Sequence, residues 1–121
     1  MIVDDNVDGC APLAKYLERQ GHSALCVPNG REALMRSILE PPEVVILDLL
    51  MPGLDGPSLL DILRSYLRLQ SLPIIVLTGA PDSPQADRVR AAGVNAVLVK
   101  GTASFKDIEY AVNDAARRLP A

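Results

Sequence analysis

Residues 44–56, Val-Val-Ile-Leu-Asp-Leu-Leu-Met-Pro-Gly-Leu-Asp-Gly, decide the fold of this chain. Four apolar residues, 44–47, lead into the carboxylate of Asp48, and a Pro-Gly turn follows at 52–53. A short apolar run bounded by proline-containing turns predicts a strand that is buried on both faces. Asp48 then lies at the carboxyl end of this strand, the edge of an open parallel sheet where ligands bind. We therefore expect Asp48 to have a role beyond packing.

Four more apolar runs, at 1–3, 23–27, 74–77 and 96–99, predict further short strands. A helix follows each strand, and the five helices are expected to open at Asp8, Asn29, Asp55, Ser83 and Ser104. Strands that alternate with helices predict a parallel sheet covered on both sides, with right-handed crossovers. We predict one α/β domain over residues 1–121, with a doubly wound, flavodoxin-like, five-stranded parallel sheet in the order 2-1-3-4-5 and five helices.

The predicted helices differ in their apolar faces. The helix after Asp55 is expected to bury Leu59, Leu60, Leu63 and Leu67 on one side, whereas the helix after Ser83 has a thin apolar face and should be the least firmly packed. Asp55 is expected to cap its helix rather than to bind a metal. His22 is expected in an exposed loop, and Tyr110 on the solvated side of the last helix.

Polar side chains stand at the ends of four predicted strands: Asp4 and Asp5, Asp48, Thr78 and Lys100. The strand order brings these ends to one edge of the sheet and places the first and third strands side by side. Two carboxylates about 4 Å apart repel by about 4 kcal/mol at an effective dielectric of 20, so three together must raise their pKa values or hold a cation. Hard oxygen ligands suit Mg²⁺, while a lysine and a hydroxyl can bind phosphoryl oxygens. The set predicts a phosphoryl-transfer centre with a carboxylate nucleophile.

These motifs resemble those of response-regulator receiver domains, the phosphoacceptor domains of two-component signalling. The matching pieces are Val3-Asp4-Asp5, the stretch 45–56, Thr78-Gly79 and Lys100. They cover nearly the whole chain, in order and at the family's spacing. The resemblance implies that Asp48 takes a phosphoryl group from the phosphohistidine of a sensor histidine kinase or phosphotransfer protein.

The resemblance also implies the roles of the remaining site residues. It implies that Asp5 binds Mg²⁺ directly, that Asp4 does so largely through water, and that Asp48 and the Leu50 carbonyl are further ligands. Thr78 and Lys100 would hold the phosphoryl oxygens and carry the signal to the face formed by the last two helices and the last strand. That face could contact an output domain or a second copy of the chain.

Two residues depart from the family pattern. Gly101 follows Lys100 where the family usually has a proline, often after a cis bond. A cis bond before glycine costs about 2.5–4 kcal/mol, so we expect a trans bond here. Val97 stands where the family usually has an aromatic residue. These departures leave open an alternative, a degenerate receiver that acts as a phosphorylation-independent protein-interaction module.

Two further function classes are less well supported. A metal-dependent phosphatase with an Asp nucleophile typically needs a second acid two residues after the nucleophile, where this chain has Leu50. A flavin-binding role is disfavoured because no Ser/Thr/Gly-rich phosphate loop follows the first strand.

Composition limits the remaining classes. The net charge is −3 and only four residues are aromatic, without clustered Lys or Arg, which argues against nucleic-acid binding by this segment. No run approaches the roughly 20 apolar residues of a membrane span. Cys10 and Cys26 show neither a metal-ligand spacing nor a disulfide framework, so we expect two free thiols in a reducing cytoplasm.

We also expect additional sequence beyond the two ends of this segment. The first strand is short, so native residues are expected upstream of Met1. An output domain could follow residue 121, and the segment could belong to a longer regulator or a hybrid kinase.

Overall fold

The computed structural model describes residues 1–49, 51 and 53–117, in which strands and helices alternate. The elements are β1 (Ile2–Val3), α1 (Val7–Arg19), β2 (Cys26–Val27), α2 (Gly30–Leu39), β3 (Val45–Asp48), α3 (Gly56–Ser65), a 3₁₀ helix η1 (Leu67–Leu69), β4 (Ile74–Thr78), α4 (Pro84–Ala92), β5 (Ala96–Val99) and α5 (Phe105–Arg117). Within the described ranges, no helix combines the length and apolar character needed to cross a membrane.

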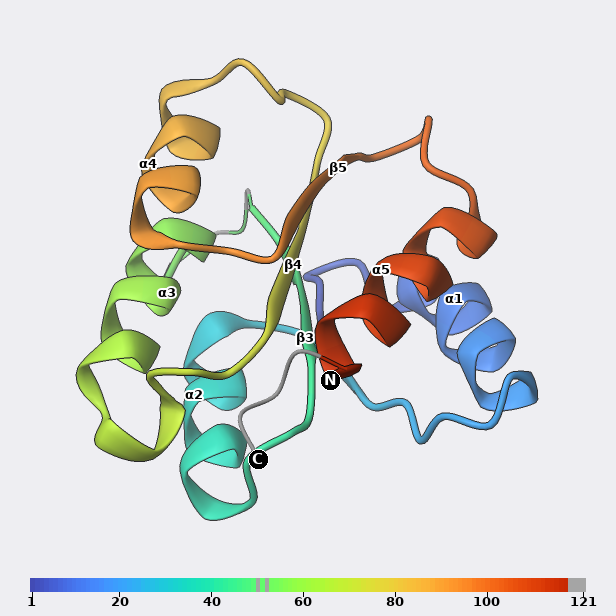
Figure 1. Cartoon of the computed structure of the whole chain (residues 1–121), viewed down its shortest axis with the longest axis horizontal. Coiled ribbons are helices and arrows are strands. Elements are labelled where there is room, and N and C mark those ends of the chain that lie inside the picture. Colours follow the sequence, from blue (N-terminus) through green and yellow to red (C-terminus); the bar gives the residue numbers. More distant parts are fainter. Residues whose placement is uncertain (50, 52, 118–121) are drawn as a thin grey trace.

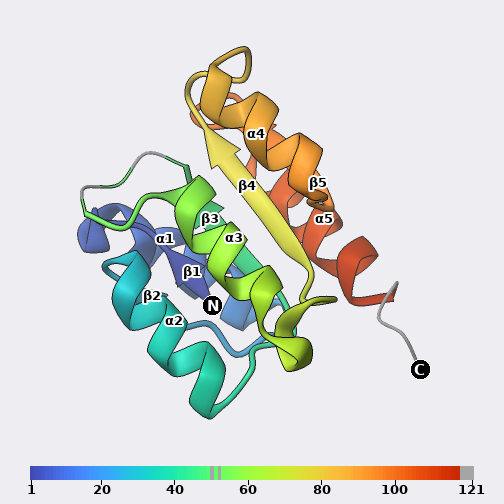
Figure 2. The same cartoon turned by 90° about the vertical axis from the view of Figure 1, so that its left-hand side faces the viewer.

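The five strands form one parallel sheet in the order β2-β1-β3-β4-β5, which confirms the predicted fold class. The sheet lies between two layers of helices (Figure 1). Helices α2, α3 and α4 cover one face, and α1 and α5 cover the other; Figure 2 looks onto the face that α2, α3 and α4 cover. The strand order reverses at β1 and β3, because β2 lies beyond β1 on one side and β4 beyond β3 on the other. Since β1 and β3 pair in parallel, their carboxyl ends lie side by side.

Side chains of successive strand residues alternate between the two faces of the sheet, as a pleated strand requires. Leu47 belongs to the apolar core under α2, α3 and α4, whereas its neighbour Ile46 belongs to the core under α1 and α5. Both are almost fully buried. The core of β3 is therefore enclosed on both faces, as its continuous apolar run predicts.

Side-chain caps hold the starts of all five described α-helices; the Asn6 side chain accepts a bond from the Gly9 nitrogen at the start of α1, and the other four follow the sequence prediction. These four cap pairs, each a side-chain oxygen and the backbone nitrogen three residues on, are Asn29 with Glu32, Asp55 with Ser58, Ser83 with Ala86 and Ser104 with Asp107. The Asp107 carboxylate also accepts a bond from the Ser104 backbone nitrogen, which completes a capping box. Asp55 is thus an N-cap and Tyr110 is 74% exposed, as predicted.

Two expectations about single residues are wrong. Leu67 was expected on the buried face of α3, but the helix ends at Ser65 and Leu67 is 84% exposed in η1. The Ser65 hydroxyl donates to the Ile62 carbonyl and Tyr66 has an extended backbone, so the helical spacing does not continue. His22 is partly buried rather than exposed.

Strand β2 is shorter than the predicted segment 23–27. It pairs with β1 in a register that joins Ile2 to Cys26 and Val3 to Val27. Because β1 has only two residues, it can organise only two residues of its neighbour.

The cysteines are also not as expected. Cys10 and Cys26 form a disulfide that links α1 to β2, with their Cα atoms 6.3 Å apart. This separation lies within the range that a disulfide spans. The prediction of two free thiols is therefore corrected. The two residues meet because α1 packs on the same sheet face toward which Cys26 points, and both belong to one apolar cluster.

Candidate functional site

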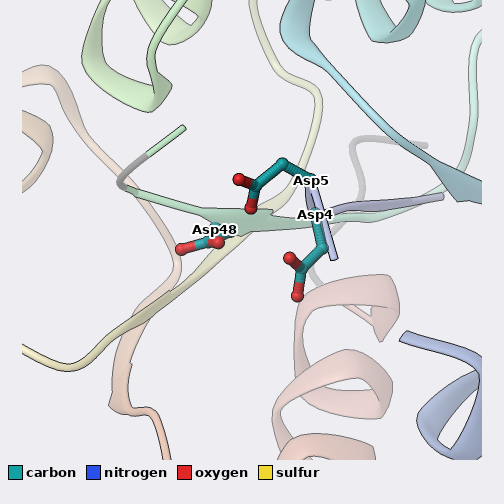
Figure 3. A group of neighbouring side chains, drawn as sticks. All are labelled: Asp4, Asp5 and Asp48. Atoms are coloured by element: carbon teal, nitrogen blue, oxygen red, sulfur yellow. The ribbon is translucent and has the colours of Figure 1, made fainter. Parts of the chain in front are cut away.

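The carboxyl ends of β1 and β3 bring three aspartates together. Asp4 and Asp5 follow β1 and Asp48 ends β3, and one carboxylate oxygen from each lies within 4.8 Å of the others. Figure 3 shows the three side chains gathered at these neighbouring strand ends. The burial of the three differs, since Asp48 is 8% exposed, Asp4 is partly buried and Asp5 is exposed.

Lys100, which follows β5, reaches across the edge of the sheet to this cluster. Its Nζ lies 3.3 Å from Asp48 Oδ2 and 3.5 Å from Asp4 Oδ2. Burial lowers the pKa of Lys100, but the attraction and hydrogen bonds of Asp48 and Asp4 outweigh this effect and raise it overall. Lys100 is therefore a cation at neutral pH, one positive charge against three carboxylates.

Asn6 is a site-forming residue that the sequence analysis did not identify. Its side-chain oxygen accepts a bond from the Gly9 nitrogen and caps α1, while its own backbone nitrogen donates to Asp4 Oδ1 at 2.9 Å. These bonds fix the turn that carries Asp4 and Asp5. An Asn just before a helical segment was the available signal.

Thr78 lies at the end of β4, almost fully buried. Its Oγ1 accepts a hydrogen bond of 3.0 Å from the backbone nitrogen of Ala80. The backbone of Lys100 is bound to the same strand end, since its nitrogen donates to the Thr78 carbonyl at 2.8 Å. The hydroxyl and the lysine are thus positioned by one pair of strands.

The structure shows the backbone at Gly101 and the packing of Val97, the two residues that depart from the family pattern. The Lys100–Gly101 peptide bond is trans, because no cis bond occurs among the described residues, and this confirms the expectation. Gly101 has a φ of 88°, a value that the ring of a proline forbids. Val97 is half-buried and packs against the core under α3 and α4.

Gly56 permits the close packing of the segment after Asp48. A Cβ at this position would lie 2.9 Å from both the Cα and the carbonyl oxygen of Leu49. The Gly56 nitrogen also donates to that carbonyl at 3.2 Å. Leu50, whose carbonyl was predicted as a metal ligand, lies outside the described residues.

A cavity of about 200 Å³ adjoins the cluster on the side of α1 and α5. Asp4, Asp48 and Lys100 line it together with apolar residues that include Cys10 and Phe105. The site therefore combines acidic oxygens and one amine with an adjoining space. Hard oxygen donors of this kind fit a divalent cation such as Mg²⁺, whose ligands lie about 2.0–2.1 Å from the metal.

Comparison with known proteins agrees with the fold and the motifs. Residues 1–113 match the response regulator receiver domain family. The chain is 37% identical over 89 residues to the transcriptional regulatory protein GltR of Pseudomonas aeruginosa, covering 74% of this chain and 36% of GltR. It is 34% identical over 110 residues to the sensory/regulatory protein RpfC of Xanthomonas campestris, covering 88% of this chain and 15% of RpfC. The chain thus spans well under two thirds of either relative.

Solved structures share the whole architecture. The receiver domain of a signal transduction histidine kinase from Syntrophus aciditrophicus superposes with a TM-score of 0.87 at 28% identity, covering 99% of this chain and 92% of that one. Because the family match extends over almost the entire chain, this protein belongs to the response regulator receiver domain family.

Proposed function

We propose that this chain is a phosphoacceptor signalling domain in which Asp48 receives a phosphoryl group from a phosphohistidine in a Mg²⁺-dependent reaction. The observation that carries the proposal is the meeting of Asp4, Asp5 and Asp48 with Lys100 at one sheet edge. Packing alone does not explain why a nearly buried carboxylate has two acidic neighbours. A site that handles a cation and a phosphoryl group does explain it.

In the proposed reaction, an Asp48 carboxylate oxygen attacks the phosphorus atom. An oxygen–phosphorus bond forms, the nitrogen–phosphorus bond of the donor breaks, and the imidazole leaves with the electron pair. The Lys100 ammonium, 3.3 Å from Asp48 Oδ2, would bind an oxygen of the negatively charged phosphoryl group as that group is transferred to Asp48. The Thr78 hydroxyl can donate to a second oxygen.

Asp4, Asp5 and Asp48 would hold Mg²⁺, with the Leu50 carbonyl as a proposed further ligand. The cation would neutralise charge on the carboxylates and on the phosphoryl oxygens. Without the cation, the cluster has more negative than positive groups, since the single ammonium of Lys100 faces three carboxylates. The donor set therefore fits the ion that the family implies.

The signal would leave the site through Thr78. If the hydroxyl moves toward a phosphoryl oxygen, its bond with the Ala80 nitrogen must lengthen or break. Ala80 belongs to the segment before α4, and α4 buries only Ala86 and Val89. We infer that the response is centred on this segment and α4, and that Tyr110 and the outer face of α5 respond less, because Val97 lacks the reach of an aromatic side chain.

The proposed setting is the cytoplasm, with a sensor histidine kinase or phosphotransfer protein as donor. An output domain or a second copy would bind the face formed by α4, β5 and α5. The alternative, a degenerate receiver that works by protein contact alone, is favoured by Val97 and Gly101. Residues 1–121 are proposed to be one domain, either alone or within a longer regulator or hybrid kinase.

Phosphorylation of Asp48 distinguishes the two functions. Incubation with Mg²⁺ and a small phosphodonor should add one acid-stable, base-labile phosphoryl group, visible by intact-protein mass. Asp48→Asn should abolish the addition. Asp55→Asn is a matched control, because asparagine also caps helices well and Asp55 lies outside the cluster. Labelling that survives Asp48→Asn would refute the assignment, and an unlabelled wild type would favour the interaction module.

A further inference from the structure

The Cys10–Cys26 disulfide adjoins the acidic cluster. Cys10 lies in the first helical turns of α1, immediately after the segment that carries Asp4 and Asp5. Cys26 begins β2 and is the register partner of Ile2, two residues before Asp4. Cys10 also lines the cavity that Asp4 and Asp48 line. The cross-link and the cluster are therefore parts of one local structure.

Hydrogen bonds connect the acidic turn to both cysteine segments. On one side, the Asp4 nitrogen donates to the carbonyl of Val27, the residue after Cys26, at 3.0 Å. On the other side, the Cys10 nitrogen donates to the Asn6 carbonyl at 3.0 Å, and Asn6 in turn binds the Asp4 carboxylate. The disulfide closes this ring of contacts, so the turn is held between two segments that are covalently joined.

The first turns of α1 need support of the kind that the Cys10–Cys26 disulfide provides. Pro12 lies inside the helix and cannot donate to the carbonyl of Asp8. Gly9 lies one turn earlier, and glycine is among the poorest helix formers. Two weak helix formers within four positions, 9–12, leave the first turns of α1 dependent on tertiary contacts. The disulfide at Cys10 supplies such a tertiary contact between Gly9 and Pro12.

We propose that Cys10 and Cys26 form a reversible redox site whose disulfide orders the turn at residues 4–6 and so raises the affinity of the acidic cluster for a divalent cation. The inference rests on the proposed function, which places the chain in the cytoplasm and assigns the cluster to Mg²⁺. Cytosolic disulfides are mostly transient and redox-sensing, so a permanent structural bond is not the expected role there.

The reaction is a thiol–disulfide exchange with a low-molecular-weight disulfide, RSSR. Cys26, the partly exposed partner, attacks RSSR as a thiolate and releases one RS⁻. The Cys10 thiolate then attacks the Cys26 sulfur of the mixed disulfide and releases the second RS⁻. Both protein thiols are oxidised, RSSR is reduced, and the two thiol protons end on two RSH molecules.

The test compares the oxidised and reduced wild-type chain. Thiols are counted by alkylation and mass, and Mg²⁺ alone is titrated into each form by calorimetry. The reduced form should bind Mg²⁺ at least about fivefold more weakly, the lower end of typical coupling between sites. Amides 5–10 should exchange faster with solvent in that form. Because coupling is reciprocal, saturating Mg²⁺ should favour the disulfide by the same factor in a glutathione buffer.

Cys26→Ser supplies the matched control. Cys10 is 2% exposed, so changing it endangers the core, whereas the partly exposed Cys26 tolerates a serine more readily. The variant should bind Mg²⁺ like the reduced wild type under both oxidising and reducing conditions.

Each contrary outcome has its own meaning. Equal affinity in both forms would overturn the coupling and leave the proposed function intact. A chain that stays reduced in an oxidising glutathione buffer would overturn the redox site alone. Failure of both forms to bind Mg²⁺ would overturn the proposed metal site, and this inference with it.

Discussion

Replacing Asp5 with asparagine should stabilise the protein when no divalent cation is present. One carboxylate oxygen from each of Asp4, Asp5 and Asp48 lies within 4.8 Å of the other two. At this distance each pair repels by about 0.9 kcal/mol in water and about 3.5 kcal/mol at an effective dielectric of 20. Asp5 is exposed, so the lower value applies to its two pairs, and Lys100 beside the other two carboxylates offsets part of it.

We therefore expect Asp5→Asn to raise the free energy of unfolding by about 1 kcal/mol, which corresponds to about 4 °C in melting temperature for a chain of this size. In the wild type, Mg²⁺ at a hundred times its dissociation constant should add about 2.7 kcal/mol. The variant should gain clearly less, because it has lost a ligand. Thermal unfolding with EDTA and then with Mg²⁺ measures both effects.

Asp8→Asn is the matched control for this experiment. Asp8 undergoes the same chemical change but lies in the first turn of α1, where a negative charge is favourable, so the variant should be slightly less stable. Its response to Mg²⁺ should equal that of the wild type. If Asp5→Asn has the same melting temperature as Asp8→Asn and the same response to Mg²⁺, the reasoning about the cluster is wrong.

Three other results are expected. Gly56→Ala should cost about 1–3 kcal/mol in urea unfolding, because its Cβ would lie 2.9 Å from the Leu49 backbone, and it should slow phosphorylation; unchanged stability would contradict the packing. Hydrogen bonds from Ser58 lower the pKa of Asp55, so its capping contribution is present above the ordinary value of 3.8 and is lost as the pH falls through the lowered pKa. Asp55→Ala should thus cost about 1 kcal/mol at pH 7, and a penalty that persists undiminished at pH 2 would refute this account. With beryllofluoride and Mg²⁺, NMR shift changes should be larger over residues 78–92 than over 97–112, and equal changes would show that the switch works without an aromatic at Val97.

Local patterns were sufficient to predict the layers of the fold and the positions of most elements. The apolar runs of β3 and β4 and the capping residues before α2 to α5 act over a few residues, so they can be recognised in the sequence alone. The polar residues at the strand ends were predicted to meet because parallel strands share one carboxyl edge. The structure places Asp4, Asp5, Asp48 and Lys100 together there, whereas their chemical roles remain predictions.

Other features depended on contacts between distant segments. The end of α3 at Ser65 allows the Arg64 guanidinium to donate to the carbonyls of Leu69, Leu72 and Gly93, and no helical periodicity encodes this arrangement. The two-residue length of β2 follows from the length of its partner β1.

The cysteine pair shows the limit of the sequence most clearly. The sequence by itself determined that Cys10 lies in a helix and that Cys26 lies in a strand. Only the tertiary structure decided that α1 lies against the same face of the sheet, with the two Cα atoms 6.3 Å apart. A spacing of 16 residues carries no such information, because a disulfide depends on distance in space, and that distance is set by how the helix packs on the sheet.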